Sequence, residues 1–186
     1  MKRSISHVSR FTSLRFTLYV FTFHVFTFPT SLAMSNPKTL SFDWVFWLQW
    51  VLVGTLGWFL GLALIGDVGV GATMGIMQWL VLRPQVRQAG WWIIVSIVGW
   101  IVGLIAIAVV PPEIGALTGV VLGVVFGTAQ WTVLQRWVHG AGWWIVVSAL
   151  GWAIGPIFGV LFVGAVVGAV TGVALELLLR HPRPET

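Results

Sequence analysis

Long runs of apolar residues fill the chain between residues 42 and 179, and only short polar or Gly- and Pro-containing loops separate them. These runs have the length of membrane helices, because about 20 residues at about 1.5 Å each cross a hydrocarbon core of roughly 30 Å. Membrane strands would alternate in polarity and close into a barrel, and these runs do not alternate. The pattern predicts an all-α, polytopic bundle of six transmembrane helices, at about 42–65, 68–82, 91–110, 114–134, 143–161 and 163–179. Because 68–82 is short, whether this helix spans fully stays open.

A cassette of polar and aromatic residues occurs twice, beginning at Gln78 and again at Gln130. The first copy reads QWLVLRPQVRQAGWWIIVSIVGWIVG and the second reads QWTVLQRWVHGAGWWIVVSALGWAIG. An Arg-bearing polar loop between two apolar halves, repeated in register, indicates that one supersecondary unit was copied. Weaker matches extend the repeat to G-W-F-L-G at 57–61 and to G-x-x-x-G-x-x-L-E at 168–176. We therefore expect three tandem helical hairpins with pseudo-threefold symmetry about the membrane normal.

The cassette G-x-x-x-G-x-x-Q-W-x-x-L-R followed by A-G-W-W resembles a group of uncharacterised Gly/Trp-rich multi-pass membrane proteins of cyanobacterial type. The resemblance covers roughly Met34 to Arg180. It implies a polytopic membrane fold and brings no established activity with it. Mitochondrial carriers also have three two-helix repeats, but their P-x-[DE]-x-x-[KR] signature is absent from this sequence.

Composition agrees with a lipid environment. Of 186 residues, 58% are hydrophobic and 8% are charged, whereas a soluble domain has roughly a quarter of charged residues. The sequence has no Cys, which excludes disulfides, thiol catalysis and Cys-ligated metals. The net charge of +5 comes from Lys and Arg residues scattered singly, so nucleic acid is not an expected partner. The expected partners are the lipid bilayer and either a second copy or a membrane-complex subunit.

The positive charges predict an orientation. If the chain has six helices, one side of the membrane receives Lys38, Arg83, Arg87, Arg136, Arg180 and Arg183, and the other receives Asp67 and Glu113. Loops rich in Lys and Arg stay in the cytoplasm. We expect a multi-pass protein of the cell membrane (inner, plasma or thylakoid-type) with both ends of its core domain cytoplasmic.

Residues 1–33 differ from the rest of the sequence, because Phe and Thr alternate through FTLYVFTFHVFTF after a basic start. Three interpretations stay open: an extension upstream of a true start at Met34, a cleaved signal peptide, or a retained anchor. The charge pattern favours Met34 as the start, because an extra span would turn the Arg-bearing loops outward. The expected domains are then this extension, a six-helix transmembrane domain at 34–181 and a cytoplasmic tail at 182–186.

Few polar side chains fall inside the predicted spans. Gln78 and Gln130 lie near helix ends, where an amide seeks a hydrogen bond from a neighbouring helix or from Ser96 and Ser148. Apart from Asp43 at the very start of the first span, Glu176 is the only acidic residue within a predicted span, and such groups suggest function. Arg180 stands four residues later, so a structural ion pair is equally natural. The candidate polar membrane sites are therefore Gln78, Gln130, Glu176 and Arg180.

Gly and Trp suggest close helix packing. Gly recurs at four-residue spacing in the runs 115–127, 151–159 and 164–172, as in small-x-x-x-small helix contacts, and a Gly-lined pore is the alternative. Trp58, Trp100 and Trp152 lie deep in the spans beside Gly, where they fill gaps or hold a flat apolar ligand. We expect interfacial anchoring by the remaining helix-end residues, Trp44, Trp91, Trp92, Trp137, Trp143 and Trp144.

The sequence has no Ser-His-Asp set, phosphate-binding loop or cluster with metal-ligand spacing. We therefore predict no enzyme activity, no cofactor and no metal. The expected function is that of a non-catalytic integral membrane protein with a structural, assembly or accessory role. Two alternatives are a small-solute or lipid transporter with a central cavity near Glu176, and a binder of an apolar cofactor or pigment.

Overall fold

The computed structural model describes residues 41–111 and 115–183, and those from Phe42 onward belong to one compact unit. Within these residues the fold is all-α, as predicted, and has six α-helices. They are α2 (Trp44–Leu64), α3 (Val70–Leu82), α4 (Trp91–Ile107), α5 (Gly115–Leu134), α6 (Trp143–Ile154) and α7 (Val163–Leu179). The predicted extension 1–33, together with Lys38 and Glu113, lies outside the described residues.

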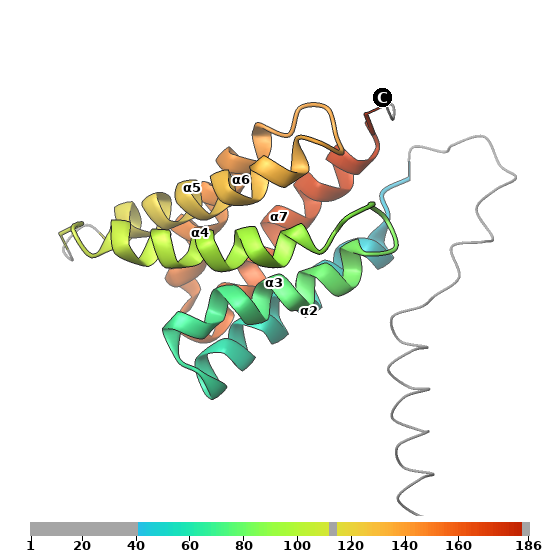
Figure 1. Ribbon diagram of the computed structural model, residues 1–186. Coiled ribbons are helices and arrows are strands. Elements are labelled where there is room, and N and C mark those ends of the chain that lie inside the picture. Colours follow the sequence, from blue (N-terminus) through green and yellow to red (C-terminus); the bar gives the residue numbers. More distant parts are fainter. Residues whose placement is uncertain (1–40, 112–114, 184–186) are drawn as a thin grey trace, which may run out of the picture. The chain divides into compact units, whose positions relative to one another are not determined.

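The helices pack side by side in chain order, and the ring closes where α7 packs against α2 (Figure 1). Each helix thus has two principal neighbours. This arrangement follows from the short connections, because consecutive helices joined by a few residues must run antiparallel and in contact. The connections α3–α4 and α5–α6 lie at the same end of the bundle as the start of α2 and the end of α7 (Figure 1).

The connection between α6 and α7 differs from the sequence-based expectation. The apolar run predicts a helix over 143–161, but α6 ends at Ile154 and continues as two 3-10 turns, Gly155–Phe158 and Val160–Phe162. Pro156 explains the break, because proline lacks an N–H and its ring clashes with the preceding helical turn. Gly159 then adopts a φ of 91°, which a residue with a side chain rarely adopts.

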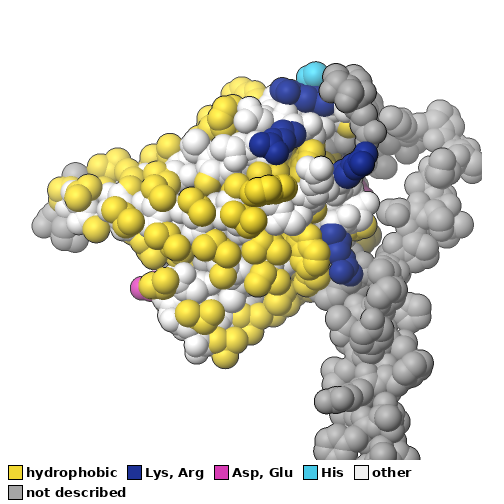
Figure 2. Space-filling model, in the orientation of Figure 1, with side chains coloured by type: hydrophobic (Ala, Val, Ile, Leu, Met, Phe, Trp, Pro, Cys, Tyr) yellow, Lys and Arg dark blue, Asp and Glu magenta, His cyan; other side chains and the backbone are white. Residues whose placement is uncertain are grey.

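Three stretches are long and apolar enough to cross a membrane: Trp44–Leu64, Gly115–Leu134 and Val160–Leu179. Three other apolar helical stretches, Asp67–Leu82, Trp91–Ile107 and Trp143–Phe158, are shorter. Large hydrophobic side chains are exposed on the sides of every helix, and Figure 2 shows them spread over the visible face. Lys and Arg side chains gather at one end of that face. Because water would not tolerate so much apolar surface, the fold belongs in a membrane.

Two layers of Trp fill the middle of the ring. In one layer the rings of Trp50, Trp92 and Trp144 lie 5.7–6.2 Å apart, and all three side chains are fully buried. In the other, Trp58, Trp100 and Trp152 lie 5.2–6.2 Å apart. α2, α4 and α6 each contribute one Trp to each layer. At about 1.5 Å per residue, the layers are about 12 Å apart.

Candidate functional site

The polar centre of the bundle is built around the first Trp layer. Trp92 on α4 donates its indole N–H to Oε1 of Gln78 on α3 at 2.9 Å, and Trp144 on α6 donates to Oε1 of Gln130 on α5 at 3.1 Å. Trp50 on α2 donates to Oγ1 of Thr171 on α7 at 3.0 Å. All three indole donors are therefore satisfied inside the bundle, which removes the penalty of burying them.

The two predicted Gln sites belong to one network. Gln78 and Gln130 are both buried, and Nε2 of Gln130 lies 3.3 Å from Oε1 of Gln78 and 3.1 Å from Oγ of Ser96. Oε1 of Gln78 therefore accepts from two donors, Trp92 and Gln130. The network ties α3, α4, α5 and α6 together without using a charged group. Such interhelical bonds contribute about 0.6–1.7 kcal/mol each in membranes.

The network does not extend to Ser148. Its Oγ is buried and has no hydrogen-bond partner among the described residues, whereas Ser96 accepts from Gln130. Thr171 is the third acceptor of this Trp layer, and its side chain is shorter than that of Gln. Its own hydroxyl donates to the Val167 carbonyl at 2.6 Å. The indole acceptor is thus a Gln for Trp92 and Trp144 and the shorter Thr171 for Trp50.

The Gly contacts give the register of α7. An added Cβ at Gly75 would lie 3.3 Å from the Cα of Ile93, the residue after Trp92. The same contact joins Gly127 to Ile145, and in α7 it is made by Gly168, which faces Val51. The sequence alignment, which pairs Gly172 with Gly75 and Gly127, is therefore wrong by one helical turn.

This register changes the interpretation of the third predicted hairpin. Thr171 stands three residues after Gly168, just as Gln78 follows Gly75 and Gln130 follows Gly127. Thr171 consequently takes the Gln position. Leu175 and Glu176 lie one turn further along α7 and do not replace the Gln-Trp pair.

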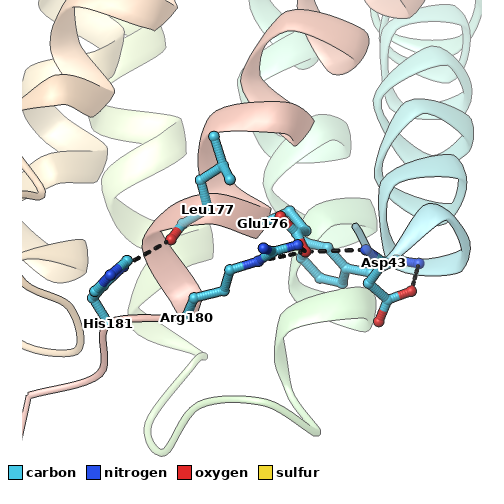
Figure 3. Close-up of polar contacts among 6 residues, drawn as sticks. Asp43, Glu176, Leu177, Arg180 and His181 are labelled. Atoms are coloured by element: carbon cyan, nitrogen blue, oxygen red, sulfur yellow. Dashed lines mark hydrogen bonds and ion pairs between the residues drawn. The ribbon is translucent and has the colours of Figure 1, made fainter. Parts of the chain in front are cut away.

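Glu176 and Arg180 form a separate site at the start of α2 (Figure 3). Oε1 of Glu176 accepts the backbone N–H of Asp43 at 3.0 Å and Nε of Arg180 at 2.9 Å, and Nη2 of Arg180 completes the ion pair. Asp43 is the N-cap of α2 and accepts from the N–H of Phe46. A carboxylate is favourable here, because free N–H groups and the helix dipole point at it.

The predicted polar sites therefore do not converge. The hydrogen bonds of Gln78 and Gln130 connect them to the Trp layer, whereas those of Glu176 connect it to Arg180 and to the α2 terminus. Glu176 is 6% exposed, and its second oxygen, Oε2, has no hydrogen-bond partner in the part of the chain that the structure describes. This arrangement connects α7 to the first turn of α2, where the ring of helices closes.

The A-G-W-W motif contains one interfacial and one core residue in each copy. Trp91 and Trp143 are 52% and 68% exposed and suit the predicted role at the lipid–water interface. Trp92 and Trp144 are buried in the first Trp layer, so their predicted role as interfacial anchors is wrong. Adjacent residues on a helix point about 100° apart, and one of each pair must face inward.

Gly residues set how closely the helices approach. An added Cβ at Gly119 or Gly123 on α5 would lie 2.4–2.6 Å from the backbone of α6, and one at Gly164 or Gly168 on α7 would lie 2.8–3.1 Å from the backbone of α2. These four Gly residues therefore lie in helix–helix contacts, whereas an added Cβ at Gly115 or Gly159 would meet nothing within 4 Å.

Sequence reasoning missed Trp50 and Thr171. The signal for Trp50 was its distance from Trp58, because the same spacing separates Trp92 from Trp100 and Trp144 from Trp152. Thr171 had no comparable signal, since a single hydroxyl on a membrane helix usually bonds to its own backbone.

Among the described residues, no three His, Cys, Asp or Glu side chains are grouped so that they could hold a metal ion. No protein-family model, curated protein or solved structure matches the chain. The resemblance to the cyanobacterial Gly/Trp-rich group therefore stays a prediction.

Proposed function

We propose that this protein is a non-catalytic membrane scaffold, with a structural, assembly or accessory role. The observation that carries the proposal is the filled centre of the ring. Six Trp side chains in two layers occupy it, and the layer of Trp50, Trp92 and Trp144 has all its donors satisfied by neighbouring helices. Because its centre is filled, such a protein can contact partners only through its outer surfaces and its loops.

We further propose that all six helices span, as three hairpins with pseudo-threefold symmetry. Equivalent hydrogen bonds link α3 to α4, α5 to α6 and α7 to α2, always from a Trp on the first helix of one hairpin to the second helix of the preceding one. The second Trp layer, formed by Trp58, Trp100 and Trp152, supports the same symmetry. Trp100 donates to the Asp67 carbonyl in the α2–α3 turn, and Trp58 donates to the Val160 carbonyl in the α6–α7 turn.

The proposed orientation has the Arg-bearing end in the cytoplasm. In the described part of the chain, Arg83, Arg87 and Arg136 lie in the loops at that end, and Arg180 and Arg183 follow α7. Asp67 lies in the turn at the opposite end. This distribution follows the positive-inside rule.

The alternative functions have less support. A transporter with a central path would need Gln78, Gln130 and Glu176 on one surface, and their hydrogen bonds lie in two different places. An apolar cofactor stacked on the deep Trp residues would need space, and Trp58, Trp100 and Trp152 contact one another.

A flux assay tests the proposal. The full chain is reconstituted in liposomes, and the permeation of water, glycerol, K⁺ and protons is compared with that of protein-free liposomes. We expect equal rates, and we expect the purified protein to be colourless. Protein-dependent flux that Glu176→Gln abolishes would establish the transporter instead, and a bound chromophore would establish the cofactor binder.

A further inference from the structure

The turn between α6 and α7 exposes an unusual apolar segment. Its large side chains are 57–76% exposed: Ile157, Phe158, Val160, Leu161 and Phe162. No charged residue occurs between Trp143 and Leu175. In water, such large apolar side chains are more stable when buried than when exposed, so this segment is suited to contact with lipid.

The lengths of the two helical stretches that flank this segment indicate how deep it lies. The 12 residues of α6 rise about 18 Å, and the 4 residues of the following 3-10 turn add about 8 Å. Measured from the exposed Trp143, the turn therefore lies about 26 Å along the helix. A hydrocarbon core is roughly 30 Å thick, and Val160–Leu179 on the other side of the turn is itself long enough to cross it, so the turn lies close to the far boundary of the core.

The backbone of the segment is suited to lipid. Gly159 donates its N–H to the Pro156 carbonyl, and Phe162 donates to the Gly159 carbonyl, both at 3.0 Å. Pro156 has no N–H to satisfy. The Val160 carbonyl accepts the indole N–H of Trp58 at 2.8 Å. Non-helical backbone is tolerated at membrane depth when neighbouring protein groups satisfy it in this way.

The α2–α3 turn at the same end of the bundle offers a contrast. α2 has 21 residues and rises about 31 Å, which is enough to cross the core. Its turn contains Gly66, with a φ of 83°, and the exposed, charged Asp67. Asp67–Leu82 is as short as Trp143–Phe158, so the two turns differ in polarity and not in reach.

We propose that residues 155–162 lie among the acyl chains of the far leaflet and do not reach water, whereas the α2–α3 turn does. This inference rests on the six-span topology proposed above. The surface is continuous with the lipid-facing sides of α6 and α7, where Leu150 and Val173 are also exposed. The occupant is therefore lipid.

Site-directed spin labelling tests the inference, and the absence of native Cys makes single-Cys variants straightforward. The full chain carries a nitroxide at Phe158→Cys or Leu161→Cys and is reconstituted in liposomes. Collisions with O₂ report lipid, and collisions with a water-soluble nickel chelate report water. The controls are Val98→Cys, an exposed residue on the side of α4, Asp67→Cys in the polar turn, and Arg136→Cys in the Arg-bearing loop.

We expect the labels at 158 and 161 to resemble Val98→Cys, with O₂ accessibility several-fold above nickel accessibility, and Asp67→Cys to show the reverse. Nickel accessibility at both 158 and 161 equal to that at Asp67→Cys would overturn the inference. Low accessibility to both reagents would also overturn it, because a second copy or another protein would then cover the segment. If Arg136→Cys resembled Val98→Cys, the proposed topology itself would fail. Because both tested side chains are exposed, their labels do not disturb the core.

Discussion

The indole N–H of Trp92 donates to the side-chain oxygen of Gln78 at 2.9 Å, and this bond joins the neighbouring helices α3 and α4. Both side chains are buried, at 0% and 3% exposure. Without this bond the indole N–H of Trp92 would be an unpaired donor in the apolar interior of the bundle. The bond therefore sets the rotation of α3 and α4 against each other, and Trp144 with Gln130 does the same for α5 and α6.

Removing the indole donor at position 92 should destabilise the fold. Trp92→Phe loses the bond to Gln78 and leaves a void, so we expect a loss of about 1–3 kcal/mol in the free energy of unfolding. Trp91→Phe, the adjacent and half-exposed residue, should change it by less than about 0.5 kcal/mol. Unfolding by denaturing detergent in mixed micelles measures both. Equal losses for the two variants would contradict the role of Trp92 in the core.

The third side of the Trp layer depends on Thr171. Thr171→Val keeps the shape of the side chain but leaves the Trp50 indole without its acceptor, at an expected cost of about 1–2 kcal/mol. Thr128→Val is the matched control. Thr128 also donates to the carbonyl one turn back, at 2.6 Å, but it is exposed and accepts from no other helix. If both variants unfold at the same detergent fraction, the Trp50–Thr171 bond has no net effect.

The two Ser residues should differ although their sequence contexts match. Ser96→Ala removes an acceptor of Gln130 and should cost about 0.5–1.7 kcal/mol. Ser148→Ala removes a buried hydroxyl that has no partner, and we expect stability to be unchanged or slightly higher. The same unfolding measurement compares them. A larger loss for Ser148→Ala than for Ser96→Ala would disprove the one-sided network.

Close approach of α5 and α6 should make Gly119 intolerant of any side chain. An added Cβ would lie 2.4 Å from the Trp152 carbonyl oxygen, so Gly119→Ala must push the helices apart. We expect a loss of at least about 3 kcal/mol, or no folded protein after extraction. At Gly142 an added Cβ meets nothing within 4 Å and φ is −60°, so Gly142→Ala should fold normally. Size-exclusion chromatography after solubilisation distinguishes the two, and a monodisperse Gly119→Ala sample would refute the packing argument.

Glu176 should act through its shape and its acceptor oxygen. Glu176→Gln retains an acceptor for the Asp43 N–H and should lower stability by about 1 kcal/mol or less, since Arg180 can turn towards water. Glu176→Leu leaves that N–H without its acceptor and should cost more, about 1–3 kcal/mol. Stability of the two variants in detergent gives the comparison. The opposite order would mean that the negative charge itself is required, as expected for a functional acid.

Much of the fold could be predicted from the sequence, because apolar runs and loop residues act locally. The ends of α3, α5 and α7 agree closely with the predicted runs. The end of α6 differs from the predicted run, because Pro and Gly also occur within membrane helices. Hydropathy alone does not distinguish a helix kink from a helix end.

The polar centre was predictable only in part. Gln78 and Gln130 stood out as amides in an apolar run, and the structure joins them. The facing direction of Trp92 and the shift that brings Thr171 opposite Trp50 depend on how helices rotate and slide against one another. The rotation and sliding of the helices are set by close packing at Gly168 and its neighbours, and the repeat pattern does not predict them.

We propose that six helices cross the membrane with the Arg-bearing end in the cytoplasm, and cysteine accessibility tests this topology directly. Single Cys residues at Gln85, His139 and Asp67 are labelled in intact cells with a membrane-impermeant maleimide, before and after permeabilisation. The account predicts that Asp67→Cys reacts in intact cells and that Gln85→Cys and His139→Cys react only after permeabilisation. Labelling of Gln85→Cys and His139→Cys on opposite sides of the membrane would contradict it.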